Sequence, residues 1–250
     1  IGPEIGDMAC GEYGEGKMTE PENIFNYINE YFRHLERNNG FKALVTAGPT
    51  HEYIDPVRFI SNKSSGKQGY EIAESLKNNG FKTTLISGPT NLDPIDGVNL
   101  IKVNSAEEMF HKSLQCLPVD VAVFSAAVAD YKVKNKEKEK IKKKENMDLT
   151  LEKNVDILKH ISNHNSLRPK LVVGFAAETN ELRKNSLNKL SDKNCDWIIA
   201  NDVSNSEIGF NSEFNKVSIF YKNKNEEIIP KMKKSNIAKE IVNRIVSELN

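Results

Sequence analysis

Apolar residues in this chain follow two alternating patterns from residue 41 onward. Continuous apolar runs at 121–124 and 197–200 are typical of strands buried on both faces of a parallel sheet. Between such runs, apolar residues recur at helical spacing, as Ile72, Ala73 and Leu76 do. Together the patterns predict strands at 42–47, 82–87, 98–103, 119–125, 170–176 and 195–200, and helices at 67–79, 105–115, 155–163 and 180–193.

This alternating order predicts an α/β fold with a doubly wound, mostly parallel, Rossmann-like sheet. After it, residues 216–222 and 226–230 are expected to form a late β-hairpin, and 235–249 a closing amphipathic helix. Before it, residues 1–21 hold five glycines and two prolines, which predicts an irregular arm. A helix should then run from Pro21 to about Arg37. The expected divisions are 1–20, 21–40 and 41–250.

Composition narrows the class of protein. The chain has 250 residues, with 35 basic and 35 acidic side chains, so its overall charge favours neither a nucleic acid nor a membrane as partner. The apolar run at 121–129 is too short to span a bilayer. Three scattered cysteines and five scattered histidines match no zinc spacing. We expect a reduced, cytoplasmic protein without a metal site built from its own side chains.

The segment Asn62-Lys-Ser-Ser-Gly-Lys-Gln-Gly69 lies just before a predicted helix. Backbone N–H groups and the positive end of the helix dipole converge at such a place, and they favour an anion. Lys63 and Lys67 flank the glycine of the loop. The segment is neither a P-loop nor G-x-G-x-x-G, and a plain connection is the alternative.

Polar or glycine-rich residues also follow three other predicted strands. Small residues precede Asp130. Its carboxylate suits a nucleotide hydroxyl, an amine or a metal-bound phosphate, and a turn or N-cap residue is the alternative. Phe175 is suited to stacking on a base or to the core. Lys189 and Lys193 share one helical face, where lysines are usually solvated. Asn201 and the residue after it end a further strand. The clustering of these loops predicts a phosphorylated ligand.

Residues 131–144 contain eight lysines and two glutamates. Such a charge run is either a solvated loop or a mobile flap that closes on a polyanion. Its place after a predicted sheet strand favours the flap, because open α/β sheets bind ligands there.

Six segments of the chain together resemble a known family. In order along the chain they are Thr46-Ala-Gly-Pro-Thr-His-Glu-Tyr-Ile-Asp-Pro-Val-Arg58, Asn62 to Gly69, Ser125-Ala-Ala-Val-Ala-Asp-Tyr131, Lys140-Ile-Lys-Lys143, Gly174-Phe-Ala-Ala-Glu-Thr179 and Ala200-Asn-Asp202. They resemble phosphopantothenate–cysteine ligase, the second domain of the bacterial bifunctional coenzyme A biosynthesis protein. The resemblance covers about 41–249. It implies two steps: CTP converts 4'-phosphopantothenate to an acyl-cytidylate, and the amine of L-cysteine then displaces CMP.

The resemblance also implies roles for individual residues. Asn62 would handle the acyl-cytidylate and Lys140 would reach CTP from the flap. CTP-binding positions would be Ser125, Ala126, Asp130, Lys140, Lys153, Asn154, Val155, Phe175, Lys189 and Lys193. Phosphate- or substrate-binding positions would be Gly48, Ser64, Ser65, Gly66, Gly69 and Ala127. The family uses magnesium, carried by the nucleotide, and works as a homodimer.

The first residues resemble a different part of that bifunctional protein. The run Gly6-Asp-Met-Ala-Cys10-Gly-Glu-Tyr is similar to the substrate clamp near the end of the phosphopantothenoylcysteine decarboxylase domain. There, the clamp cysteine is a proton donor, so Cys10 would hold that role in a complete protein; otherwise it is an unused thiol. The FMN-binding body of that domain is not in the sequence. We therefore expect the chain to begin inside the decarboxylase domain.

One position departs from the family. Val155 stands where the family has proline, whose fixed φ would preset the first helical turn.

Two alternative functions make different demands on the sequence. A dinucleotide-dependent reductase would need G-x-G-x-x-G after the first strand, where the chain has Gly48-Pro49-Thr50. A non-catalytic relative should have lost Asn62 or Lys140. The choice between CTP and ATP, and which phosphate lies on loop 64–69, stay open.

Overall fold

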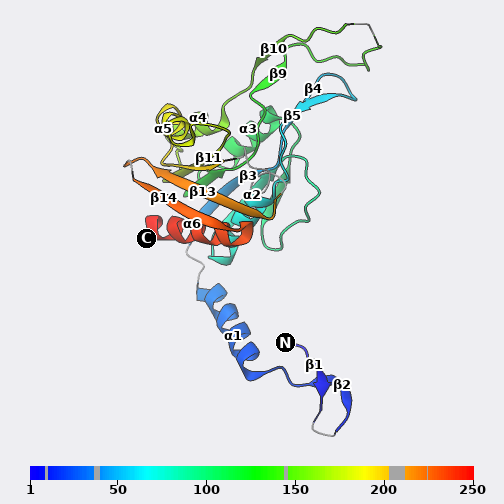
Figure 1. Cartoon of the computed structure of the whole chain (residues 1–250), viewed down its shortest axis with the longest axis vertical. Coiled ribbons are helices and arrows are strands. Elements are labelled where there is room, and N and C mark those ends of the chain that lie inside the picture. Colours follow the sequence, from blue (N-terminus) through cyan, green and yellow to red (C-terminus); the bar gives the residue numbers. More distant parts are fainter. Residues whose placement is uncertain (9–10, 37–39, 144–145, 203–211, 224) are drawn as a thin grey trace.

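The computed structural model describes the chain except for residues 9–10, 37–39, 144–145, 203–211 and 224, and side chains at 30–36 (Figure 1). Its centre is an eight-stranded sheet in the order β14-β13-β12-β11-β8-β3-β6-β7. The neighbours from β12 to β7 pair in parallel, and β13 and β14 add an antiparallel edge. The strands are β3 (Lys42–Ala47), β6 (Lys82–Ser87), β7 (Asn99–Lys102), β8 (Val121–Phe124), β11 (Leu171–Glu178), β12 (Trp197–Asp202), β13 (Phe214–Tyr221) and β14 (Glu226–Lys233).

Helices cover both faces of the sheet (Figure 1). On one face, α2 (Lys67–Asn78) and α6 (Lys234–Leu249) bury Leu76 and Ile241 against strand residues such as Val45. On the other face, α3 (Ala106–Gln115), α4 (Ile157–Ser162) and α5 (Leu182–Lys193) bury Met109 and Leu190 with Leu44. Strand β3 leads outward to β6 and β7 on one side, and β8 leads to β11 and β12 on the other. The chain therefore changes direction between β3 and β8, and loops that follow these strands diverge there.

The predicted fold class is confirmed, and most predicted elements agree with the structure within two residues. The expected irregular arm at 1–21 is wrong: β1 (Glu4–Asp7) and β2 (Tyr13–Lys17) pair there as an antiparallel hairpin. The sequence analysis also missed the short antiparallel pair β4 (His51–Tyr53) and β5 (Phe59–Ser61). A second short antiparallel pair joins β9 (Tyr131–Val133) to β10 (Leu151–Lys153) at the base of the lysine-rich segment.

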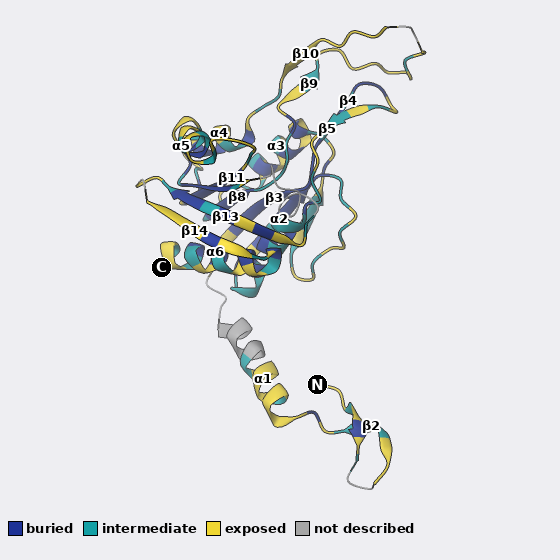
Figure 2. Ribbon diagram, in the orientation of Figure 1, coloured by how far each residue is buried: buried dark blue, intermediate teal, exposed yellow. Residues whose placement is uncertain are grey.

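Helix α1 (Pro21–Glu36) lies outside the α/β body, between that body and the β1–β2 hairpin (Figure 1). Its spacing predicts an apolar face, yet Phe25 is 62% exposed and Ile28 is 43% exposed. Figure 2 shows the described part of this helix as mainly exposed. The proposed divisions at 20 and 40 stay a prediction.

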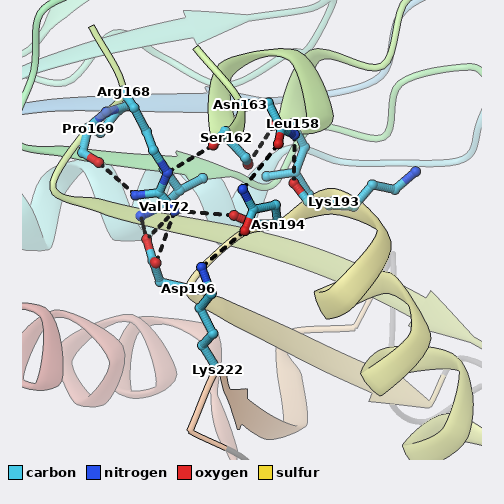
Figure 3. Close-up of polar contacts among 10 residues, drawn as sticks. All are labelled: Leu158, Ser162, Asn163, Arg168, Pro169, Val172, Lys193, Asn194, Asp196 and Lys222. Atoms are coloured by element: carbon cyan, nitrogen blue, oxygen red, sulfur yellow. Dashed lines mark hydrogen bonds and ion pairs between the residues drawn. The ribbon is translucent and has the colours of Figure 1, made fainter. Parts of the chain in front are cut away.

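One polar cluster holds the second half of the sheet to its helices (Figure 3). The Arg168 guanidinium donates to both carboxylate oxygens of Asp196, at 2.9 and 3.0 Å, and to the carbonyls of Ser162, Pro169 and Asn194. Asp196 Oδ2 also accepts from the Val172 N–H at 2.7 Å, at the start of β11. The cluster thereby joins the ends of α4 and α5 to β11 and β12.

We predict that Arg168→Met lowers the free energy of unfolding by about 2 kcal/mol, because it leaves buried carbonyls and the Asp196 carboxylate without their donor. For a chain of this length, that loss corresponds to a fall in Tm of roughly 4–8 °C. Arg183→Met is the control, since its ion pair with Glu226 is exposed and contributes less than about 1 kcal/mol. Equal Tm values for both variants would contradict the structural role of Arg168.

Candidate functional site

A crevice opens at the carboxyl ends of the parallel strands, beside the change of direction between β3 and β8. It consists of two neighbouring cavities of about 470 Å³ each, a size typical of small-molecule sites. The first cavity extends toward α4 and α5, and the second extends toward loop 62–69. Both are lined by Ala126, Val128, Asp130, Phe175 and Lys189. The two cavities therefore form one site with two compartments.

The loop that follows β8 is fastened to the loop that follows β3. The hydrogen bonds run from Ser125 Oγ to Thr46 O at 2.7 Å, from Ala127 N to Gly48 O at 2.9 Å, and from Ala129 N to Thr50 Oγ1 at 3.0 Å. The two fastened loops form the floor of the crevice. Gly48 adopts φ +75°, where glycine is favoured, and it contributes to this floor without lining either cavity.

Two glycines bring the N-terminus of α2 against this floor. Gly66 has φ +76°, and its N–H donates to Ser64 Oγ at 3.2 Å. A Cβ at Gly69 would lie 2.5 Å from Ser125 Oγ and 2.6 Å from the Ala47 Cβ, so only glycine fits there. The loop thus places the N-terminus of α2 beside the second cavity, where the helix dipole favours an anion.

Most of the predicted site residues line the two cavities. In the second cavity lie Asn62, Ser64, Ser65, Gly66, Gly69, Ser125, Ala126, Ala127, Asp130, Phe175 and Lys189. In the first cavity lie Ala126, Asp130, Lys153, Asn154, Val155, Phe175, Lys189 and Lys193. Asn62 joins the two loops, because its Nδ2 donates to Val128 O at 3.0 Å. Phe175 packs against the core and also lines both cavities, so the two roles considered for it are compatible.

Both lysines of α5 are paired with carboxylates at the wall of the crevice. Lys189 Nζ lies 2.7 Å from Glu178 Oε1, and Lys193 pairs with Asp156. Burial opposes the charge of Lys193, but hydrogen bonds to Asp156 and Asp192 outweigh this effect and raise the pKa of Lys193. An anionic ligand would compete with these carboxylates for both lysines.

The structure changes the interpretation of Val155. Helix α4 begins at Ile157, and Asp156 is its N-cap, with Oδ1 accepting from Lys159 N at 2.9 Å. Val155 therefore precedes the helix, and the expectation that it lies in the first helical turn is wrong. Its neighbour Asn154 donates from Nδ2 to Ala129 O at 3.0 Å, which holds the loop after β8 from the other side.

Lys140 lies apart from the two cavities. It belongs to the lysine-rich segment, where it lines a separate hollow with Ile54, Glu137 and Met147. The segment extends away from the sheet above β9 and β10 (Figure 1). The structure therefore does not bring Lys140 to the other predicted residues.

A buried aspartate ties this segment to the β4–β5 hairpin. Asp55 is fully buried, and its carboxylate accepts from the backbone N–H groups of Val57, Arg58 and Ile141 at 2.8–3.1 Å. The Arg58 guanidinium donates to Asp55 at 3.1 Å and to Ile141 O at 3.3 Å. Burial opposes the charge of Asp55, but these donors outweigh it and lower the pKa of Asp55. Since Ile141 follows Lys140 directly, Asp55 sets where Lys140 lies.

The predicted proton donor, a metal site and a membrane-spanning helix are the remaining features to place in the structure. Cys10 lies outside the described residues. Over the described ranges, no group of three or more His, Cys, Asp or Glu side chains could hold a metal ion. Within the same ranges, no helix is long and apolar enough to cross a membrane.

No role was assigned from the sequence to three residues, of which one holds the lysine-rich segment and two line the crevice. Asp55 reads as an ordinary turn residue, while Asn215 and Lys234 belong to the late antiparallel strand and the closing helix. Asn215 and Lys234 line the second cavity opposite loop 64–69. Their position depends on tertiary packing, which no local pattern encodes.

Comparison with known proteins identifies a family. Residues 38–249 match the DNA/pantothenate metabolism flavoprotein C-terminal domain. The chain is 42% identical over 248 residues to the coenzyme A biosynthesis bifunctional protein CoaBC of Haemophilus influenzae, and 39% identical over 252 residues to that of Bacillus subtilis. These matches cover 98% and 99% of this chain but 61% and 62% of the relatives. The chain thus spans about three-fifths of their length.

Solved structures agree with this result. The crystal structure of the C-terminal domain of CoaBC is 38% identical, with a TM-score of 0.71, and the match covers 84% of this chain and 96% of that domain. A Cab2 mutant in complex with phosphopantothenate-cysteine is 17% identical, with a TM-score of 0.67 over 92% of this chain and 94% of Cab2. The second likeness concerns the fold alone.

We predict that Asp55→Asn releases the lysine-rich segment, because an amide cannot accept from all the donors that the carboxylate binds. Limited proteolysis with trypsin should then cleave at residues 132–143 roughly tenfold faster, since cleavage follows the population of the open form. The low pKa keeps Asp55 ionised from neutral pH down past the usual value for aspartate, so an assay at pH 8 measures the intact tie. Asp148→Asn, an exposed change just after this segment, is the control. Equal cleavage of the two variants would contradict this tie.

Proposed function

Because the chain belongs to the DNA/pantothenate metabolism flavoprotein C-terminal domain family, we propose that it is the ligase of coenzyme A biosynthesis that joins 4'-phosphopantothenate to L-cysteine at the expense of CTP. The observation that carries this proposal is the two-compartment crevice, which has a phosphate cradle at one end and paired lysines at the other. The name of the curated relatives and the ligand of Cab2 support the same reaction.

In the proposed first step, a carboxylate oxygen of phosphopantothenate attacks the α-phosphorus of CTP. The bond from that phosphorus to pyrophosphate breaks, and an acyl-cytidylate forms. In the second step, the cysteine amine attacks the acyl carbon, loses a proton and displaces CMP, which keeps one oxygen of the original carboxylate. The site would bind both substrates beside each other, which converts each step into a reaction between held groups.

The residues of the crevice divide between these tasks. Phe175 would stack on the base, while Lys189 and Lys193 would exchange their carboxylate partners for phosphate oxygens. Cations near the α-phosphate stabilise the charge that develops during attack. Asn62, at the junction of the two loops, would hold the acyl-cytidylate for the amine. The remaining predicted contacts are Ser64, Ser65, Gly66, Gly69, Ser125, Ala126, Ala127, Lys153, Asn154 and Val155. Gly48, predicted with them, lines neither cavity and would act by holding Ala127.

Magnesium and FMN would serve two different reactions. Magnesium would arrive with CTP and neutralise phosphate charge, and Asp130, which lines both cavities, would face it. FMN and the proton-donor role of Cys10 belong to the decarboxylase activity that we propose for a longer protein, as the name of the bifunctional relatives suggests. A homodimer through the ligase domain in the cytoplasm is part of the same proposal.

The proposal is tested by measuring pyrophosphate release with phosphopantothenate, L-cysteine and magnesium, with either CTP or ATP as nucleotide. We expect release with CTP, equal in amount to phosphopantothenoylcysteine, and much less with ATP. No reaction with either nucleotide would contradict the ligase assignment. Release of orthophosphate together with phosphopantothenoylcysteine would contradict nucleotidyl transfer and leave the ligase assignment standing. Equal rates with ATP would contradict only the choice of nucleotide.

We predict that Asn62→Asp separates the two steps. Pyrophosphate should still be released from CTP and phosphopantothenate, whereas ligated product should fall by roughly a hundredfold, because a second negative charge beside the acyl-cytidylate disturbs its hold. Product and pyrophosphate are measured in the same reaction. The assignment of Asn62 fails if the variant makes product at the normal rate.

We also predict that Lys140→Gln lowers kcat roughly tenfold or more and leaves Tm nearly unchanged, because its segment has to close over the crevice before Lys140 reaches CTP. Lys138→Gln, an exposed lysine in the same segment, should keep normal kcat and serves as the control. A large loss of Tm with normal kcat would make Lys140 a structural residue instead.

A further inference from the structure

The wall of the second cavity opposite loop 64–69 is polar and buried. It is formed by Asn215 near the start of β13 and by Lys234 at the start of α6. Asn215 is 4% exposed and Lys234 is 6% exposed. Buried amide and ammonium groups that line a cavity are unusual unless they bind something polar.

Asn215 occupies a place where the strand otherwise carries apolar residues. Val217 and Ile219 lie on the same face of β13 and belong to the core, so an apolar residue is expected at 215. The pairing of β13 with β14 is irregular between Asn215 and Val217, and such bulges turn side chains toward functional sites. Asn215 Oδ1 accepts from Lys216 N at 3.0 Å, while its side-chain nitrogen has no hydrogen-bond partner among the residues described.

Lys234 is held in place by its backbone. Its N–H donates to Glu213 O at 3.0 Å, and its carbonyl accepts from Gln68 Nε2 at 3.3 Å, which joins the start of α6 to the start of α2. Burial, together with the nearby positive charge of Lys67, lowers the pKa of Lys234. Lys67 itself pairs with the exposed carboxylate of Glu213. The negative charge of Glu213 acts in the opposite direction on Lys234, so both lysines share this carboxylate as a neighbour. A bound phosphate would add negative charge beside the two lysines.

We propose that Lys234 and Asn215 bind a phosphate dianion against loop 64–69, so that the phosphate lies between this wall and the N-terminus of α2. Lys234 would supply the charge, Asn215 would donate from its side-chain nitrogen, and the loop would donate from its backbone. Given the proposed function, on which this identification rests, the dianion is the terminal phosphate of the nucleotide or the phosphate of phosphopantothenate. The geometry of the wall suits either group, because both end in a phosphate with three terminal oxygens.

The direct test is the affinity for inorganic tripolyphosphate, measured by calorimetry on the full chain. We expect Lys234→Met to weaken binding roughly ten- to a hundredfold, the range for losing a charge-assisted hydrogen bond. Lys239→Met removes the same charge from an exposed position on α6 and should bind as the wild type does. Circular dichroism and Tm verify that each variant is folded.

Two further arms distinguish the source of the phosphate. If it is the terminal phosphate of the nucleotide, Lys234→Met weakens CTP binding but leaves CMP binding unchanged. If it belongs to the second substrate, the variant weakens phosphopantothenate binding but leaves pantothenate unchanged. Asn215→Asp gives an independent variant for the case in which Lys234→Met does not fold. Its added carboxylate should repel tripolyphosphate and weaken binding by at least tenfold.

Folded variants that bind tripolyphosphate, CTP and phosphopantothenate as tightly as the wild type would overturn the assignment of this wall. The outcome is separable from the proposed function. If the wild-type chain is an active ligase and the variants bind phosphate normally, only the proposed role of Lys234 and Asn215 is contradicted. A wild-type chain that makes no product, but whose tripolyphosphate binding depends on Lys234, contradicts the ligase proposal and leaves the phosphate site standing.

Discussion

The hydrogen bonds that join the loop after β8 to the loop after β3 fix the shape of the crevice. Where the connections after two neighbouring parallel strands run in opposite directions, a gap opens between the two loops. Here Ser125, Ala127 and Ala129 form hydrogen bonds across the gap to residues 46–50. The same floor receives α2, because Gly69 permits contact with Ser125 and with Ala47. The position of the anion cradle thus follows from the packing of one helix on two fastened strand ends.

Charge is organised around that floor in two ways. At the first cavity, Lys189 and Lys193 pair with Glu178 and Asp156. At the second cavity, the buried Lys234 lies near Lys67, whose partner is the exposed Glu213. In both places an anionic ligand would compete with a carboxylate for a lysine, so phosphate contacts are proposed in both compartments.

The sequence was sufficient for the parallel core and for the turn into α2, because each depends on local patterns. Continuous apolar runs identify buried parallel strands, and the glycines at 66 and 69 identify a turn into a helix. Three-residue strands such as β4 and β5 carry too few residues for a period to appear. Asn215 and Lys234 reach the site only because β13 and α6 pack beside α2. The separation of Lys140 from the crevice depends on Asp55, whose hydrogen bond from Ile141 joins residues that are distant in the sequence.

The central claim is that the crevice activates a carboxylate by transferring a nucleotidyl group to it. The most direct measurement uses phosphopantothenate with ¹⁸O in both carboxylate oxygens, together with unlabelled CTP and cysteine, and mass spectrometry of the products. Our account predicts one ¹⁸O in the phosphate of CMP and one in the amide of phosphopantothenoylcysteine. Label in orthophosphate or pyrophosphate, with none in CMP, would contradict nucleotidyl transfer at this site.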